Sequence, residues 1–218
     1  MKTLRNLYDS HLDRITQFVG TFPDAGLQGP LLMDPAAYFD QRTKLLVVGQ
    51  ETGGWFDDYN DIDAQLDGYR KFNLGDKWQG PFWNITRKVE PLLGVDRCSC
   101  AWTNLNRFDQ DGEPPTGAVL DAMPTLDFLL REEIEILRPD VCLLYTNRKY
   151  DARIKALYPG VQFSDIEGLP SSHFARLTHA DLPPLTIRTP HPRTIRMKGW
   201  EEAFLNSLKG LFANDRNG

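Results

Sequence analysis

Residues 44–55 read KLLVVGQETGGW, an apolar run that passes directly into glycine, glutamine and glutamate. A short run of leucine and valine is typical of a strand that is buried on both faces of a parallel sheet. We therefore expect a central strand at residues 44–48, with Glu51 just beyond its carboxyl end. The two glycines that follow Thr52 would let the backbone and a ligand approach each other closely. The stretch predicts a buried strand that ends at a chemical site.

Three further strands are expected along the chain, each in a short run of apolar or β-branched residues. They lie in CSCAWTNLNRF at residues 98–108, in PDVCLLYT at 139–146, and at 185–188 within PPLTIRTPHP. Apolar residues spaced three and four positions apart predict helices around these strands. The helical segments are residues 4–19, 81–93, 120–137, 150–160 and 200–212.

The alternation of strands with helices predicts the α/β class. In such a chain, a strand that follows a helix normally lies parallel to the strand before it. We expect a three-layer α/β/α arrangement, with a central, mostly parallel, four-stranded sheet and helices on both faces. A chain of 218 residues, 41% of them hydrophobic, is suited to one substantial core, so residues 1–218 are expected to form a single domain.

Composition narrows the possible partners. No window approaches the roughly 18 apolar residues of a membrane helix, so no membrane partner is expected. The charged N-terminal segment lacks the apolar core of a secretory signal, which predicts a soluble, cytoplasmic protein. The three cysteines have no second Cys/His pair at zinc-finger spacing, so neither a metal nor another cofactor is expected.

The net charge of −5 argues against a protein that coats nucleic acid by bulk attraction. One short stretch is nevertheless basic: residues 188–198, RTPHPRTIRMK, contain four Lys or Arg residues and no acidic residue. A solvated loop can have the same composition. The stretch is therefore compatible with a local phosphate contact and does not by itself establish one.

Polar residues follow every predicted strand at its carboxyl end. They are Gln50 and Glu51 after the first strand, Asn104 and Asn106 after the second, Thr146 and Asn147 after the third, and His191 after the fourth. In open α/β sheets, ligands bind in the crevice outside these strand ends. Each position alone is weak evidence for a functional site, because the strands of a purely structural sheet also end in polar loops. Together, however, a carboxylate, amides and an imidazole can converge on one cleft.

Four motifs occur in an order that resembles the uracil-DNA glycosylase superfamily. They are VVGQETGGW, WTNLNRF, PDVCLLYTN and TPHPRTIR, and the resemblance spans residues 44–200. It implies that Gly49 and Gln50 border a base pocket with their backbone. It also implies that Glu51 stands where the best-known branch of the family has an aspartate, which positions or activates the attacking water.

The same resemblance implies that Asn104 or Asn106 reads the edge of uracil and that His191 is the histidine of the His-Pro motif. Hydrolysis of a base–sugar bond builds positive charge on the sugar and negative charge on the departing base. Glu51 would stabilise the first, and His191 would donate to the developing oxyanion. An asparagine amide offers both the donor and the acceptor that match the O4 and N3–H groups of uracil.

A flipped base also needs an aromatic wall to receive it. The candidates for this wall are Phe82, Trp83 and Trp55, although core packing is the simpler explanation for each one alone. Arg193, Arg196 and Lys198 would then contact phosphates beside the flipped nucleotide. DNA is therefore the expected partner, through a local basic loop.

The sequence departs from the family at the first motif. Glu51 is one methylene longer than aspartate, and Thr52-Gly53-Gly54 replaces the proline and the aromatic residue that usually close the pocket against thymine. Three functions stay open. The first is a DNA glycosylase-like hydrolase that releases uracil or another deaminated base in DNA repair by base excision. The others are a noncatalytic nucleobase- or DNA-binding module of the same fold and a hydrolase of small nucleotides.

Overall fold

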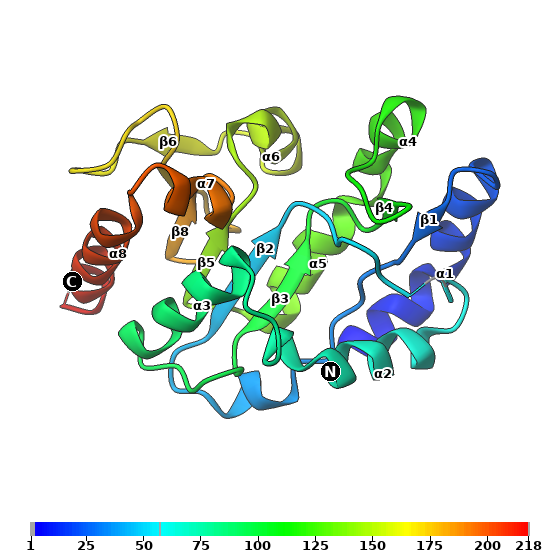
Figure 1. Ribbon diagram of the computed structural model, residues 1–218, viewed down its shortest axis with the longest axis horizontal. Helices are drawn as coiled ribbons and strands as arrows, with labels where there is room; N and C mark the ends of the chain where they lie inside the picture. The colour runs from blue at the N-terminus through cyan, green and yellow to red at the C-terminus, as the bar shows by residue number, and fades with distance from the viewer. Residues whose placement is uncertain (1–2, 57, 218) are drawn as a thin grey trace.

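A six-stranded sheet forms the centre of the computed structural model, which describes residues 3–56 and 58–217 (Figure 1). Its strand order is β3-β2-β5-β8-β7-β6. The strands are β2 (Leu45–Gly49), β3 (Ala101–Asn104), β5 (Val141–Leu144), β6 (Gln162–Ser164), β7 (Ala175–Thr178) and β8 (Leu185–Arg188). β2 pairs in parallel with β3 and β5, and β5 pairs in parallel with β8. The class is therefore α/β with a mostly parallel sheet, as the sequence predicts.

The sheet has six strands rather than the four that the sequence predicts. All four predicted strands are present, and they are the ones that pair in parallel. β6 and β7 extend the sheet antiparallel from β8. The residues of β7 alternate between buried and more exposed positions, and β6 is mostly exposed. Neither strand therefore contains the continuous apolar run from which the other four are predicted. A separate two-stranded sheet pairs β1 (Leu27–Gln28) with β4 (Asp109–Gln110).

Helices form in each of the segments where apolar spacing predicts them. These are α1 (Leu4–Thr21), α3 (Pro81–Leu92), α5 (Phe128–Leu137), α6 (Asp151–Leu157) and α8 (Glu201–Asn217). The spacing does not predict α2 (Ile62–Phe72), α4 (Gly117–Ala122) or α7 (Pro192–Met197) as separate helices. Short 3₁₀ turns occur at η1 (Ala36–Asp40), η2 (Asn73–Gly75), η3 (Met123–Leu126) and η4 (Arg148–Tyr150).

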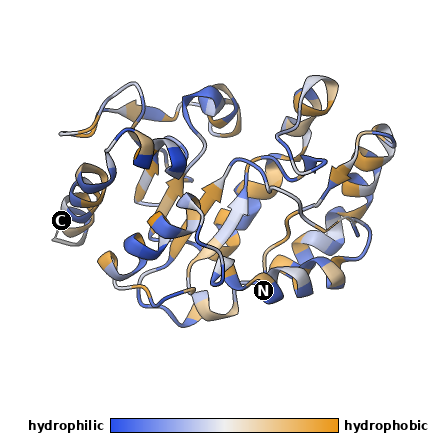
Figure 2. Ribbon diagram, in the orientation of Figure 1, coloured by the Kyte–Doolittle hydropathy of each residue, from blue (hydrophilic) through white to orange (hydrophobic). Residues whose placement is uncertain are grey.

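The helices pack around the sheet in two groups. In Figure 1, α3 crosses in front of the sheet and α5 lies behind it. α3 contacts both α7 and α8, and α1 contacts both α2 and α5. Figure 2 shows β2 and β5 as predominantly apolar, and every residue of these two strands is buried. No helix in the described part of the chain is long and apolar enough to cross a membrane.

A buried ion pair connects three of these elements within the core. The guanidinium of Arg107, just after β3, donates to both carboxylate oxygens of Glu133 in α5, at 2.8 and 2.6 Å, and neither side chain is more than 1% exposed. Tyr8 of α1 donates to the same carboxylate at 2.9 Å, and the hydroxyl group of Thr103 in β3 donates at 3.2 Å. The Glu133 carboxylate is thus stabilised by a charge and by several hydrogen bonds.

Glu133→Gln is expected to lower the free energy of unfolding by roughly 3–5 kcal/mol, because it leaves the buried Arg107 charge without its counterion. Urea denaturation measures the change. Glu202→Gln, which removes an exposed carboxylate on α8, is the control and should change stability by less than about 0.5 kcal/mol. Replacing both partners, with Arg107→Met and Glu133→Leu, should restore part of the loss. A Glu133→Gln protein as stable as the wild type would contradict the role given to this pair.

Candidate active site

A cavity of about 440 Å³ opens beside the carboxyl ends of the parallel strands. Six residues that the sequence singles out line it: Glu51, Trp55, Phe82, Trp83, Asn104 and His191. The loop of residues 52–54 and four further aromatic residues complete the wall. Residues from after β2, from β3, from α3 and from after β8 therefore meet at one place, as the rule for ligand sites in α/β sheets predicts.

Glu51 is held from behind by two side chains. The Asn106 amide nitrogen Nδ2 donates to Glu51 Oε2 at 3.0 Å, and the Tyr150 hydroxyl group lies 3.4 Å from the same oxygen. Burial raises the pKa of Glu51 above its ordinary value. The hydrogen bonds from Asn106 and Tyr150 and the nearby charge of Lys149 lower the pKa in part. The hydrogen bonds and the Lys149 charge thus offset only part of the cost of burying the ionised Glu51 carboxylate.

Asn106 is fully buried and does not line the cavity. Its Oδ1 accepts a hydrogen bond of 2.5 Å from the guanidinium of Arg153, which leaves Nδ2 to face Glu51 and Tyr150. Arg153 is itself fixed by Asp127, whose Oδ2 accepts from Nε at 3.0 Å. Asn106 therefore positions Glu51, and it is not placed to read a ligand.

Asn104 is the asparagine that lines the cavity. Its Oδ1 accepts the indole N–H of Trp102 at 3.2 Å, which fixes the orientation of the amide because that indole nitrogen can only donate. Its Nδ2 is buried and has no hydrogen-bond partner among the described residues. An unpaired buried donor costs ~1–3 kcal/mol. A ligand acceptor placed at this nitrogen would remove that cost.

Gly49 makes room for this amide. A Cβ atom at position 49 would lie 2.3 Å from Asn104 Oδ1 and 3.2 Å from the Phe82 ring, so any other residue would displace one of them. Gly49 and Gln50, which the resemblance places beside a base pocket, are not among the residues that line this cavity. Their carbonyl groups accept the backbone N–H groups of Leu105 and Asn106, at 3.0 and 2.7 Å, and so extend the parallel pairing of β2 with β3.

His191 caps α7 and lines the cavity. Its Nδ1 accepts the backbone N–H of Arg193 at 3.1 Å, so the single proton of the neutral imidazole is on Nε2. Burial lowers the pKa of His191, and the charges of Arg193 and Lys149 lower it further. At neutral pH the imidazole is therefore a neutral donor through Nε2.

The aromatic residues differ in how they contribute to the wall. Trp55 and Trp83 are buried and pack edge-on against Trp102, with ring centroids 5.6 and 5.1 Å apart. Phe82 is partly exposed and its centroid lies 6.0 Å from that of His191. Phe82 is thus the predicted aromatic residue best placed to stack on a ligand that also reaches the imidazole, whereas Trp55 and Trp83 shape the rigid floor.

The loop of residues 52–54 is attached to the buried carboxylate of Asp109. Oδ2 of Asp109 accepts from the Thr52 hydroxyl group and, at 3.1 Å, from the backbone N–H of Gly54. Its other oxygen accepts from the backbone N–H of Gly112 at 3.0 Å. Asp109 therefore holds the glycine-rich loop in place. Residues 53 and 54 of this loop line the cavity with their backbone, because glycine has no side chain.

The three predicted phosphate contacts lie outside the cavity. Arg193 and Arg196 belong to α7 and Lys198 follows it directly, and all three are exposed. The Arg196 guanidinium is 3.8 Å from the carboxylate of Glu201, which offsets part of its charge. Arg193 is the residue of the three that adjoins the site, through its contact with His191.

Four residues behind or near Glu51 are not predicted from any sequence motif: Tyr150, Arg153, Asp127 and Lys149. Chemically, the site combines a partly buried carboxylate, a neutral imidazole donor and an unpaired amide donor around an aromatic cavity. Such a set can stabilise a positive centre on one side of a bound group and a negative one on the other. No protein-family model and no curated protein sequence matches this chain.

Glu51→Gln is expected to raise the melting temperature at pH 7. The raised pKa means that folding favours the protonated carboxyl group, so its stabilising effect is present at low pH and is lost as pH rises through the folded-state pKa. Glutamine keeps an acceptor for Asn106 and does not titrate. Each kcal/mol gained in the free energy of unfolding raises the melting temperature by roughly 2–4 °C in a domain of this size.

Differential scanning calorimetry from pH 7 to below the ordinary glutamate pKa of 4.5 measures this effect. The difference between Glu51→Gln and wild type should shrink towards zero at the acid end. Glu202→Gln, at an exposed position, should show no such trend. A Glu51→Gln protein that melts at a lower temperature than wild type at pH 7 would contradict the conclusion that burial destabilises the ionised form of Glu51.

Proposed function

We propose that this protein is a DNA glycosylase-like hydrolase of the uracil-DNA glycosylase type, with the three-layer α/β/α arrangement of that superfamily. It would cleave the N-glycosidic bond of uracil or another deaminated base after base flipping. The observation that carries the proposal is the convergence of Glu51, Asn104 and His191 on one aromatic cavity. DNA repair by base excision is the process to which such an activity would belong.

The free donor of Asn104 favours a deaminated base as the substrate over the base with an amino group from which it forms. Its free Nδ2 can donate to a carbonyl oxygen, and it would face an exocyclic amino group donor to donor. Deamination replaces the amino group of cytosine or adenine with a carbonyl. An unpaired donor in a buried site discriminates strongly, because the wrong partner leaves both groups unsatisfied.

The remaining residues fit the charge changes of the reaction. As the bond between C1′ and the base nitrogen breaks, its electron pair leaves with the base, and Nε2–H of His191 would donate to the oxygen that gains negative charge. The ionised Glu51 would stabilise the cationic sugar and accept the proton of the water that adds to C1′. Asn106 and Tyr150 hold the carboxylate in one orientation for this step.

A hydrolase of small nucleotides is the second candidate. The net charge of −5 and the carboxylate of Glu201 next to Arg196 weaken attraction to a long polyanion. A small nucleotide needs fewer phosphate contacts than DNA. The same cavity chemistry would then act on a free nucleotide.

Base release is tested on single- and double-stranded oligonucleotides that contain uracil, hypoxanthine or xanthine, followed by alkaline cleavage at abasic sites. Wild type is expected to release at least one of these bases. Glu51→Gln and His191→Ala should each lower the rate about 10²- to 10⁴-fold, the usual contribution of a positioned acid or base. Glu202→Gln should have wild-type activity.

Other outcomes separate the alternatives. Retention of uracil-containing DNA on a filter without base release would favour the noncatalytic binding module. Release of base from free nucleotides only would favour the second hydrolase. Unchanged activity in both Glu51→Gln and His191→Ala would refute the proposed site.

The rate of base release should fall towards acid pH as Glu51 becomes protonated. The hydrogen bond from Tyr150 lowers the pKa of Glu51, so Tyr150→Phe should raise that pKa and move the acid limb to higher pH. At neutral pH and above the rate should change little, because the lowered pKa of His191 keeps its imidazole neutral there. Rates measured across the acid limb check this, and a limb that moves to lower pH would be incompatible with the proposed role of Glu51.

A further inference from the structure

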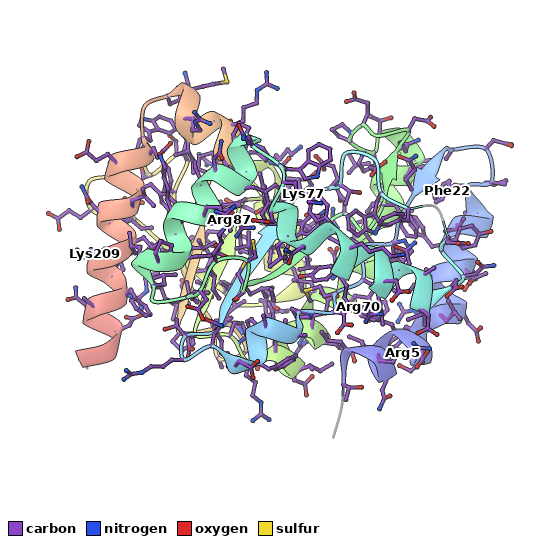
Figure 3. All side chains as sticks on the ribbon, turned by 60° about the horizontal axis from the view of Figure 1, so that its bottom comes forward. Arg5, Phe22, Arg70, Lys77, Arg87 and Lys209 are labelled. Atoms are coloured by element: carbon purple, nitrogen blue, oxygen red, sulfur yellow. The ribbon has the colours of Figure 1, made fainter. Side chains whose placement is uncertain are left out.

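A second cavity of about 270 Å³ adjoins the first. Three aromatic residues, Phe56, Phe72 and Trp78, line both cavities. Lys71 and Lys77 line the second cavity only. Figure 3 shows Lys77 between α2 and α3. We call this second cavity the Trp78 subsite.

Two of the shared aromatic side chains are open to solvent. Trp78 is 65% exposed and Phe56 is 45% exposed, which is unusual for such large apolar groups. The Trp78 ring meets Phe72 at a tilt, with centroids 6.3 Å apart, so most of the indole surface stays accessible. An accessible indole at the mouth of a cavity is a surface on which a planar ring can stack.

The backbone that carries these rings is held in place. Trp78 follows η2, and its backbone N–H donates to the carbonyl oxygen of Gly75 at 2.8 Å. A Cβ atom at Gly75 would lie 2.4 Å from the indole of Trp83, so the turn packs directly on the floor of the first cavity. A Cβ atom at Gly68 of α2 would likewise lie 2.3 Å from the Phe56 ring, which rests on that helix. The platform is therefore formed before any ligand arrives.

The charges around the subsite favour an anion. Lys71 and Lys77 are exposed beside the rings. Asp76 also lines the subsite, but the Arg97 guanidinium binds its carboxylate at 2.8 and 3.0 Å and offsets its charge. Stacking rings next to lysine side chains match the two parts of a nucleotide, its base and its phosphate.

We propose that the Trp78 subsite binds the nucleotide next to the one in the first cavity, with the neighbouring base on Trp78 and a phosphate at Lys71 or Lys77. A base that stacks on Trp78 has left its own helical stack, which is least costly in a single strand. The preferred substrate is therefore single-stranded DNA. This inference deepens the proposed function, and it rests on that function for the identification of the ligand as DNA.

Binding is measured without any base release, by fluorescence anisotropy of a labelled single-stranded oligothymidine and of its duplex with oligoadenine. Trp78→Ala should weaken binding of the single strand roughly 5- to 150-fold, the range expected for one stacked base. Lys77→Gln should lower the slope of log affinity against log salt by about 0.7, the value for one phosphate on a single strand. Phe39→Ala, at a 53% exposed aromatic outside both cavities, should bind as wild type does.

The results separate this inference from the proposed function. If Trp78→Ala binds the single strand as tightly as wild type, the subsite is refuted, whatever base release shows. If the duplex is bound as tightly as the single strand, the strand preference is refuted. If binding of the single strand depends on Trp78 and no base is released from any oligonucleotide, the subsite stands and the glycosylase activity fails. Melting curves of the Trp78→Ala, Lys77→Gln and Phe39→Ala proteins check that all three variants are folded.

Discussion

The guanidinium of Arg153 is the group on which the arrangement of the cavity depends. It donates to the carboxylate of Asp127, to the carbonyl oxygen of Leu105 and to the side chain of Asn106. These partners lie in the crossover from β3 to α5, whereas Arg153 itself belongs to α6, after β5. Asn106 in turn orients Glu51, just after β2. One planar cation with several donors thus connects α6 to the segments that follow β3 and, through Asn106, to the segment that follows β2.

The buried carboxylate of Glu133 and the partly buried carboxylate of Glu51 contrast in their surroundings. The carboxylate of Glu133 meets a guanidinium and two hydroxyl groups, so its charge is fully compensated within the core. Glu51 is only partly compensated, and near it Asn104 carries an unpaired donor. Burial of incompletely satisfied polar groups opposes folding. It also leaves the cavity with unused capacity to bind charge and hydrogen-bonding groups, which is the property that a binding or catalytic site requires.

Much of the frame of the site could be predicted from the sequence, because the relevant signals are local. The apolar runs at residues 45–48 and 141–144 form buried parallel strands, and the residues just after such strands face the ligand crevice. Glu51, Asn104, Asn106 and His191 are predicted to share one cleft because they lie at the strand ends, and the structure brings Glu51, Asn104 and His191 to one cavity.

The finer assignments could not be predicted, because they depend on side-chain contacts between distant segments. Asn104 and Asn106 are two positions apart and would share a face of a continuing strand, but β3 ends at Asn104 and Asn106 turns behind Glu51. Tyr150 and Arg153 resemble ordinary residues at the start of a short helix, and nothing local indicates their partners 44 and 47 positions away.

The attachment of the glycine-rich loop to Asp109 has a consequence for the thermodynamics of recognition. Residues 52–54 contain two glycines, which in a free loop would have wide conformational freedom and would lose entropy when a ligand ordered them. Here that freedom is already lost when the chain folds, since Asp109 belongs to β4 and its carboxylate holds the backbone of the loop. A ligand therefore meets a wall that is already ordered, and its affinity is not reduced by the entropy of arranging that wall.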